Sequence, residues 1–189
     1  MVLKDILDET LRVLKDGGII LYPTDTVWGI GCDATRADSV ARIFGIKRRA
    51  EAKSMVLLAA DLDMVARHVR RIPDVAIDLV EVNDAPMTIV YPDAMGLAPN
   101  VIAEDGSVGI RIPRHPFCTE LLRRFRRPIV STSANLSGEP TPENFAQISP
   151  EIREAVDYVV DRSMEKGASG RSSQIIKLGL RGEVEIIRA

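Results

Sequence analysis

The sequence predicts an α/β fold with one mixed sheet, and three observations support this prediction. Strand-like and helix-like segments mingle from one end of the chain to the other, which favours one α/β unit over separate helical and sheet domains. Several strand-like segments are almost continuously apolar, as is typical of a sheet covered on part of both faces. The chain has 189 residues, of which 46% are apolar and 28% charged, so it can bury a sizeable core.

In the first half, apolar residues spaced three or four apart predict helices, and short apolar runs that stop at glycine or proline predict strands. Gly17 and Gly18 end the first helix, Asp61 is a candidate N-cap and Pro73 opens a helix. Residues 24–36 are expected to form a polar loop. The expected helices are 3–15, 37–46, 61–72 and 73–82, and the expected strands are 18–23, 54–60 and 86–92.

In the second half, Val108, Ile110 and Ile112 alternate with other residues, which predicts a strand with one buried face. Residues 162–173 are polar and glycine-rich, and are expected to form a flexible loop. We expect residues 1–189 to form a single domain. The expected strands are 107–113, 128–133, 157–161, 173–178 and 183–188, and the expected helices are 116–125, 143–148 and 150–155.

Composition excludes several classes of protein. Lysine and arginine number 25 and aspartate and glutamate 27, and the resulting net charge of −2 excludes a bulk polyanion binder. The basic residues are clustered, however, which suits a small anionic ligand, limited contact with RNA, or simply solvated helix faces. The two cysteines lack metal-site spacing, the N-terminus lacks a signal-peptide pattern, and no segment has the roughly 20 apolar residues that span a membrane. These features predict a cytoplasmic protein with reduced cysteines and no membrane partner.

Polar groups gather where predicted strands end. Residues 22–34 present the triplet Thr24–Thr26 and then Gly29 and Gly31, which allow tight turns or the close approach of a ligand; a plain polar turn is the alternative.

A second loop, residues 46–55, contains Lys47 and Arg49, which lie on one side of the chain if the segment is extended. A guanidinium and an ammonium together suit phosphates, and an exposed basic loop is the alternative.

The predicted strand 107–113 places Ser107, Gly109 and Arg111 on one face. An arginine buried in a strand needs a carboxylate, and either a structural ion pair or a ligand carboxylate would supply it. The sequence is compatible both with an ion pair and with a ligand carboxylate.

The stretch 128–140 places Ser131 and Ser133 on one face, followed by Asn135. The sequence contains no Walker-type loop and no GxSxG elbow, and its only histidines are His68, expected on a surface helix, and His115. A Ser/His/Asp hydrolase is therefore poorly supported. We expect these serines to be hydrogen-bonding groups and not nucleophiles.

Taken together, these stretches resemble the YrdC family. The motifs "YPTDTVWGIGCDA", "KRR" followed by "KSM", "SVGIRIP", "STSANLSGEP" and the tail "SSQIIKL…EIIR" occur in the family's order, from about Leu11 to Arg188. The resemblance implies a twisted mixed sheet flanked by helices around a concave basic cavity, in a single YrdC-like domain. The chain is similar to the short type of the family, without the extra C-terminal domain of longer relatives.

The resemblance also implies a reaction, that of the threonylcarbamoyl-adenylate synthases. Such enzymes form threonylcarbamoyl-AMP and pyrophosphate from L-threonine, bicarbonate or CO2, and ATP, with Mg²⁺ expected beside the ATP. Other proteins then transfer the threonylcarbamoyl group to adenosine 37 of tRNA. A non-catalytic module that binds double-stranded RNA or tRNA is the main alternative, and a carbamoyl-transfer enzyme is a weaker one.

Residue roles follow from the motifs. The resemblance implies that Lys47 and Arg49 hold phosphates and stabilise the transition state, without a covalent nucleophile. Leu58, Gln174 and Lys177 depart from the family pattern near the amino-acid pocket. Threonine is assigned to Thr26, Arg111, Ser131 and Ser173, and the nucleotide to Lys47, Arg49, Lys53, Ser107, Ser133, Asn135, Thr141 and Arg188.

Overall fold

Strands from the whole length of the chain join in one mixed sheet. The computed structural model describes residues 2–48 and 55–189, and within these ranges nine strands lie in the order β7-β1-β2-β6-β3-β5-β4-β8-β9. The pairs β1·β7, β3·β5 and β4·β8 are parallel and the other neighbours antiparallel, so the prediction of a mixed sheet is confirmed. The strands are β1 (Ile20–Tyr22), β2 (Gly29–Gly31), β3 (Val56–Leu58), β4 (Met87–Tyr91), β5 (Val108–Arg111), β6 (Ile129–Ser133), β7 (Tyr158–Val159), β8 (Gln174–Leu178) and β9 (Val184–Arg188).

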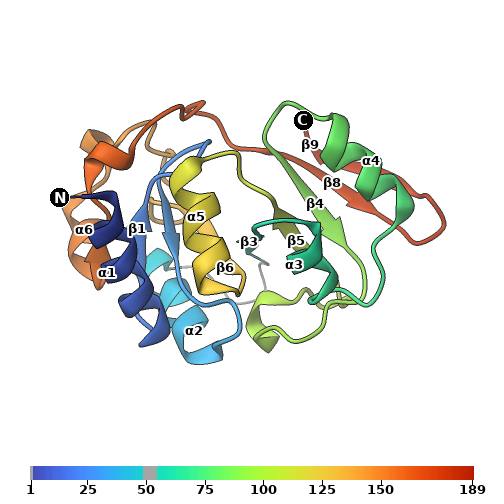
Figure 1. Ribbon diagram of the computed structural model, residues 1–189, viewed down its shortest axis with the longest axis horizontal. Coiled ribbons are helices and arrows are strands. Elements are labelled where there is room, and N and C mark those ends of the chain that lie inside the picture. Colours follow the sequence, from blue (N-terminus) through green and yellow to red (C-terminus); the bar gives the residue numbers. More distant parts are fainter. Residues whose placement is uncertain (1, 49–54) are drawn as a thin grey trace.

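Helices cover the sheet in two groups. Figure 1 shows α1, α2 and α5 over the half that contains β1 and β6, and α3 and α4 over the half that contains β4 and β8. None of the helices in the described ranges is long and apolar enough to cross a membrane. The helices are α1 (Leu3–Lys15), α2 (Ala37–Lys47), α3 (Leu62–Ala66), α4 (Asp74–Val82), α5 (Pro116–Phe125) and α6 (Pro150–Ala155), with 3₁₀ turns η1 (Pro99–Val101), η2 (Phe145–Gln147) and η3 (Arg162–Met164).

The strand register separates the two faces of the sheet. Ile89 pairs with Ile110, Ile110 with Leu57, and Leu57 with Val130, and all four are buried. Since successive residues of a strand point to opposite faces, the residues between them form a second row on the other face. The first row belongs to the core, and the second is free to build a site.

One predicted helix is too long. The helix expected over residues 61–72 ends at Ala66, because the following backbone pairs with another segment: Arg70 N donates to Asp93 O at 2.9 Å and Met95 N donates to His68 O at 2.9 Å. His68 therefore lies in a turn and not on a surface helix. The N-cap prediction is confirmed, since the Asp61 side chain accepts from Met64 N at 2.8 Å.

The prediction of a loop over residues 24–36 is wrong, because this segment contains strand β2. The strand was not predicted because two of its three residues are glycines. A Cβ on Gly31 would lie 2.5 Å from Val130 O and 2.7 Å from the ring of Tyr22. Gly31 is therefore required by close packing inside the sheet and not by a ligand. The expected strand over 157–161 shortens to β7, and the loop 162–173 begins with η3.

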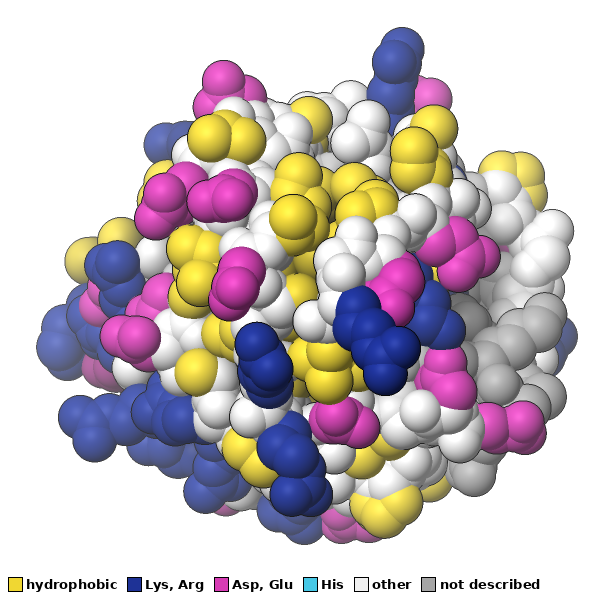
Figure 2. All heavy atoms as spheres, turned by 90° about the vertical axis from the view of Figure 1, so that its right-hand side faces the viewer, with side chains coloured by type: hydrophobic (Ala, Val, Ile, Leu, Met, Phe, Trp, Pro, Cys, Tyr) yellow, Lys and Arg dark blue, Asp and Glu magenta, His cyan; other side chains and the backbone are white. Residues whose placement is uncertain are grey.

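The last strand, β9, is an open edge of the sheet. Figure 2 looks at the end of the molecule that carries α4 and β9, where hydrophobic side chains gather near the centre of the face. Charged side chains on an exposed strand limit its pairing with another chain, and Glu185 supplies one. The exposed apolar residues of β9 are Val184, Ile186 and Ile187.

Candidate functional site

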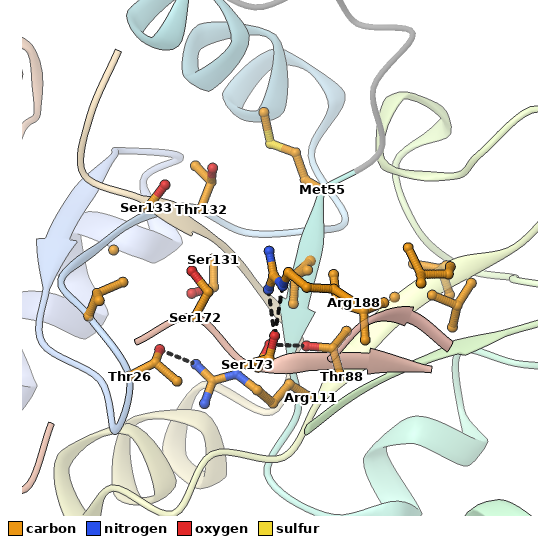
Figure 3. A pocket seen from close by; sticks show the side chains of 18 of the residues that line it. Thr26, Met55, Thr88, Arg111, Ser131, Thr132, Ser133, Ser172, Ser173 and Arg188 are labelled. Carbon is orange, nitrogen blue, oxygen red and sulfur yellow. Dashed lines mark hydrogen bonds between the residues drawn. The ribbon is translucent and has the colours of Figure 1, made fainter. Parts of the chain in front are cut away.

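A cavity of about 360 Å³ opens on the face of the sheet opposite the buried row. This volume lies at the lower end of the range for small-molecule sites. The described residues that line it come from the loop before β2, from strands β2 to β6, β8 and β9, and from the segments that lead into β3, β5 and β8. Figure 3 shows Thr26, Arg111, Ser131, Ser173 and Arg188 converging on this space.

The floor of the cavity is one row of the strand register. Ser131 pairs with Val56, Val56 with Gly109, and Gly109 with Val90, and all four line the cavity. Ser107, Gly109 and Arg111 also line it and Ile110 and Ile112 do not, as the predicted period of two requires, although Val108 lines it as well. Sheet order brings the serines of β6 and the arginine of β5 to one surface.

Arg111 forms the buried charge of the site. It is 4% exposed, pairs through Nη1 with the carboxylate of Asp25 and donates from Nη2 to Thr26 Oγ1 at 3.2 Å. The other oxygen of Asp25 accepts from Arg114 N at 3.0 Å. Of the two partners left open by the sequence, the structure contains the ion pair. A guanidinium has five N–H donors, so Arg111 keeps donors for a ligand at the cavity wall.

A second cluster lies where β4, β9 and the residue before β8 meet. Ser173 Oγ and Thr88 Oγ1 lie 2.7 Å apart, and Arg188 donates from Nε and Nη2 to Ser173 O at 2.9 and 2.7 Å. Burial lowers the pKa of Arg188 from its usual value. The sequence analysis missed Thr88, although the period of two in strand 86–92 puts it on the face of Val90.

Lys47 holds the end of β6 in place. It is the last residue of α2 and 3% exposed, and its Nζ donates to Ser133 O at 2.6 Å and Asn135 O at 2.7 Å. The expectation of an extended segment is wrong at Lys47, because α2 runs through it and Arg48 then takes a left-handed conformation with φ 50°. Asn135 in turn donates from Nδ2 to Glu139 O at 2.7 Å, which closes the turn after β6.

The twelve candidate residues separate into three groups. Lys47, Asn135 and Thr141 lie among the described residues but outside the cavity lining. Arg49 and Lys53 lie outside the described residues. The cavity brings together Thr26, Ser107, Arg111, Ser131, Ser133, Ser173 and Arg188.

The segment 162–173 passes over the site, and we call it the strap. Ser169 N donates to Asp25 O at 3.0 Å and Gly170 N to Thr26 O at 2.9 Å. Glu165 Oε1 accepts from Trp28 Nε1 at 2.8 Å, which ties the strap to the loop before β2. The strap places Ser172 in the cavity, a residue that sequence reasoning missed although it stands in the same polar loop as Ser173.

The chemistry of the site is that of hydrogen bonding and positive charge. Among the described residues that line the cavity, the charged ones are Arg111 and Arg188. His115 is buried, its pKa is lowered mainly by that burial, and no described serine is hydrogen-bonded to its ring. No described serine therefore has the histidine base that a nucleophile requires. The cysteines are both buried and free, as expected.

Relatives of known name match almost the whole chain. The family model described as "Telomere recombination", which covers Sua5, YciO and YrdC proteins, matches residues 12–189. The threonylcarbamoyl-AMP synthase of Stenotrophomonas maltophilia is 35% identical over 158 residues, which cover 82% of this chain and 85% of that protein. The threonylcarbamoyl-AMP synthase of Xanthomonas euvesicatoria is 34% identical over 172 residues, which cover 89% and 91%.

Solved structures share the fold. P. abyssi Sua5 complexed with L-threonine has a TM-score of 0.84 at 24% identity, with 94% of this chain and 52% of that chain covered. MTH1692 of Methanobacterium thermoautotrophicum has a TM-score of 0.73 at 32% identity, with 98% and 86% covered. The family model, the curated relatives and the shared fold agree, and the chain belongs to the Sua5/YciO/YrdC family.

Proposed function

We propose that this protein is an enzyme that forms L-threonylcarbamoyl-AMP and pyrophosphate from L-threonine, bicarbonate or CO2, and ATP, and thus acts as a nucleotidyltransferase. The observation that carries the proposal is the cavity, in which the family's hydroxyl and arginine positions converge on one face of the sheet. Relatives named threonylcarbamoyl-AMP synthase at 34–35% identity support it. The product serves cytoplasmic proteins that transfer its threonylcarbamoyl group to adenosine 37 of tRNA.

We assign L-threonine to the end of the cavity around Arg111. Arg111 offers the threonine carboxylate those N–H donors that it does not use for Asp25 and Thr26. The hydroxyls of Thr26, Ser131 and Ser173 can bind the remaining polar groups of threonine. The strap is held beside this end by its bonds to the backbone of residues 25 and 26.

The reaction needs orientation more than it needs a nucleophile. The threonine amine adds to CO2 with release of a proton, or to bicarbonate with loss of water, to form a carbamate. A carbamate oxygen then attacks the α-phosphorus of ATP, and pyrophosphate leaves. Holding the two reactants in line supplies most of the acceleration in such transfers.

We assign the neutralisation of the negative ATP phosphates to Lys47 and Arg49, and both assignments remain predictions. The Nζ contacts of Lys47 with Ser133 O and Asn135 O support an additional task, that of positioning the β6 serines. The described cavity residues include no aspartate or glutamate, and the described chain has no cluster of three metal-ligating side chains. Mg²⁺ would therefore be held by phosphate oxygens and water, and no step is assigned to it.

The test is an assay of the purified protein with ATP, bicarbonate and threonine, serine or glycine, without RNA. We expect pyrophosphate that depends on both threonine and bicarbonate, and a product with the mass of threonylcarbamoyl-AMP. Lys47→Ala and Arg49→Ala are each expected to lower the rate at least about tenfold, or about 1.4 kcal/mol, with exposed Lys15→Ala as the control.

Two outcomes would contradict the proposal. Binding of RNA without any threonine-dependent pyrophosphate would indicate the non-catalytic module. Turnover of carbamoyl phosphate in place of threonine and bicarbonate would indicate a carbamoyl-transfer enzyme.

A further inference from the structure

Ser107 is held rigidly at the cavity wall, at the opposite end of β5 from Arg111. It is 5% exposed and ends a tight turn in which Gly106 N donates to Ala103 O and Ala103 N donates to Ser107 O, both at 2.9 Å. Gly106 has φ +79°, a conformation that favours glycine. The position of the Ser107 hydroxyl is therefore set by the backbone.

The Ser107 hydroxyl donates its single proton in a hydrogen bond to Asp105. Its Oγ lies 2.6 Å from Asp105 Oδ1, which also accepts from Ser107 N at 3.0 Å. Lys177 Nζ binds the other oxygen of Asp105 at 2.6 Å. These contacts, with that of Lys177 the largest, hold the pKa of Asp105 far below its usual value, so the carboxylate is ionised and only accepts. A serine hydroxyl has one proton and two lone pairs, so Ser107 presents lone pairs to the cavity.

We propose that Asp105, held by Lys177, fixes Ser107 as a hydrogen-bond acceptor and thereby makes this wall of the cavity select an N–H or O–H donor of the nucleotide. A phosphate or carbonyl oxygen at the same place meets lone pairs and finds no proton. The inference rests on one part of the proposed function, the binding of ATP in the cavity. Asp105 and Lys177 are positioning residues that act through Ser107.

The floor beside Ser107 suits the base or the sugar of a nucleotide. Gly109 lies two residues further along the same face of β5, between Val56 and Val90. A Cβ on Gly109 would make only ordinary contacts, the shortest 3.4 Å, so packing alone does not demand a glycine. Its missing side chain leaves a flat apolar floor. The matching donors of ATP are the exocyclic amino group of adenine and the hydroxyl groups of ribose.

The test compares dissociation constants of ATP and of analogues that lack one donor, measured by isothermal titration calorimetry. ITP has a carbonyl in place of the adenine amino group, and 2′-deoxy-ATP and 3′-deoxy-ATP each lack one hydroxyl. The wild-type protein is expected to bind one of these analogues about threefold to tenfold more weakly than ATP. The analogue that loses affinity identifies the group that contacts Ser107.

Variants distinguish the orientation of the Ser107 hydroxyl by Asp105 from a general loss of structure. Asp105→Ala lets the hydroxyl rotate and donate, so we expect the preference for ATP to fall to near unity; Ser107→Ala should do the same, and the double variant should add nothing. Asp105→Asn keeps an acceptor oxygen and should retain the preference. Asp161→Ala is the matched control, because Asp161 Oδ1 accepts from Ser163 N at 2.9 Å and Oγ at 2.6 Å, outside the cavity lining.

The outcomes distinguish the inference from the proposed function. An unchanged preference in Asp105→Ala and Ser107→Ala, equal binding of all four nucleotides by the wild type, or a loss of preference in Asp161→Ala overturns the inference. If those results accompany threonine-dependent pyrophosphate formation, the proposed function stands alone. If the expected preferences appear without any such product, the proposed function fails and the inference stands.

Discussion

Removing the carboxylate of Asp25 is the perturbation with the largest expected effect on stability. The side chains of Arg111 and Asp25 are 4% and 9% exposed, so solvent screens their interaction little. Asp25→Asn removes the charge but keeps an amide oxygen that can accept from Arg114 N. The buried guanidinium then has no counter-charge, and removing one partner of a buried pair costs about 3 kcal/mol or more.

The magnitude can be read from chemical denaturation. With an m value of about 2 to 3 kcal/mol/M for a protein of this size, a loss of about 3 kcal/mol lowers the urea midpoint by about 1 to 1.5 M. Asp84→Asn is the matched control, because Asp84 also pairs with an arginine, Arg114, but is 100% exposed. We expect no measurable shift of its midpoint, since exposed pairs contribute little.

A double variant completes this test. Asp25→Asn combined with Arg111→Met removes the uncompensated charge, and it should be at least as stable as Asp25→Asn alone. Equal midpoints for Asp25→Asn and Asp84→Asn, at unchanged m values, would refute the assignment of the stabilisation to a buried ion pair. A double variant less stable than Asp25→Asn would show that Arg111 contributes through packing and not through charge.

Three further outcomes are expected, each measurable by urea denaturation. Gly31→Ala should lower the free energy of unfolding by about 1 to 3 kcal/mol, because a Cβ there would lie 2.5 Å from a backbone oxygen of β6. An unchanged urea midpoint would show that β2 and β6 can move apart at little cost in stability. Asp61→Ala should cost about 1 kcal/mol through loss of the cap, whereas Asp63→Ala, in the same turn without a cap bond, should not. The pKa of Asp157 is lowered mainly by its hydrogen bond with Arg42, so its contribution is present near neutral pH and is lost as the pH falls below about 4; the gap between wild type and Asp157→Asn should therefore close in acid.

The local pattern predicted most of the elements and part of the site. Period-two spacing placed Ser107 and Arg111, and then Ser131 and Ser133, on shared faces, and all four line the cavity. The prediction works because the side-chain direction in a strand depends only on the parity of the position. The same reasoning did not find β2, since a strand whose only side chain beyond Cα is that of Ile30 shows no alternation.

Other residues could be placed only by tertiary structure. The length of α3 depends on backbone pairing with residues 93–95, which nothing within 61–72 reveals. The role of Lys47 depends on carbonyl groups 86 and 88 positions away. Thr88 reaches Ser173 across 85 positions, because β4 and β8 are parallel neighbours.

The order of residues along the chain was enough to predict the α/β class, the strands that carry polar side chains and the family to which those motifs point. These features depend on short-range periodicity and on motif order, both of which are visible in one dimension. Tertiary structure alone decided that Asp25 neutralises Arg111, that Lys47 anchors the end of β6, and that Lys177 and Asp105 orient Ser107. Each of these depends on strand order and register, which bring charges from distant segments within hydrogen-bonding distance.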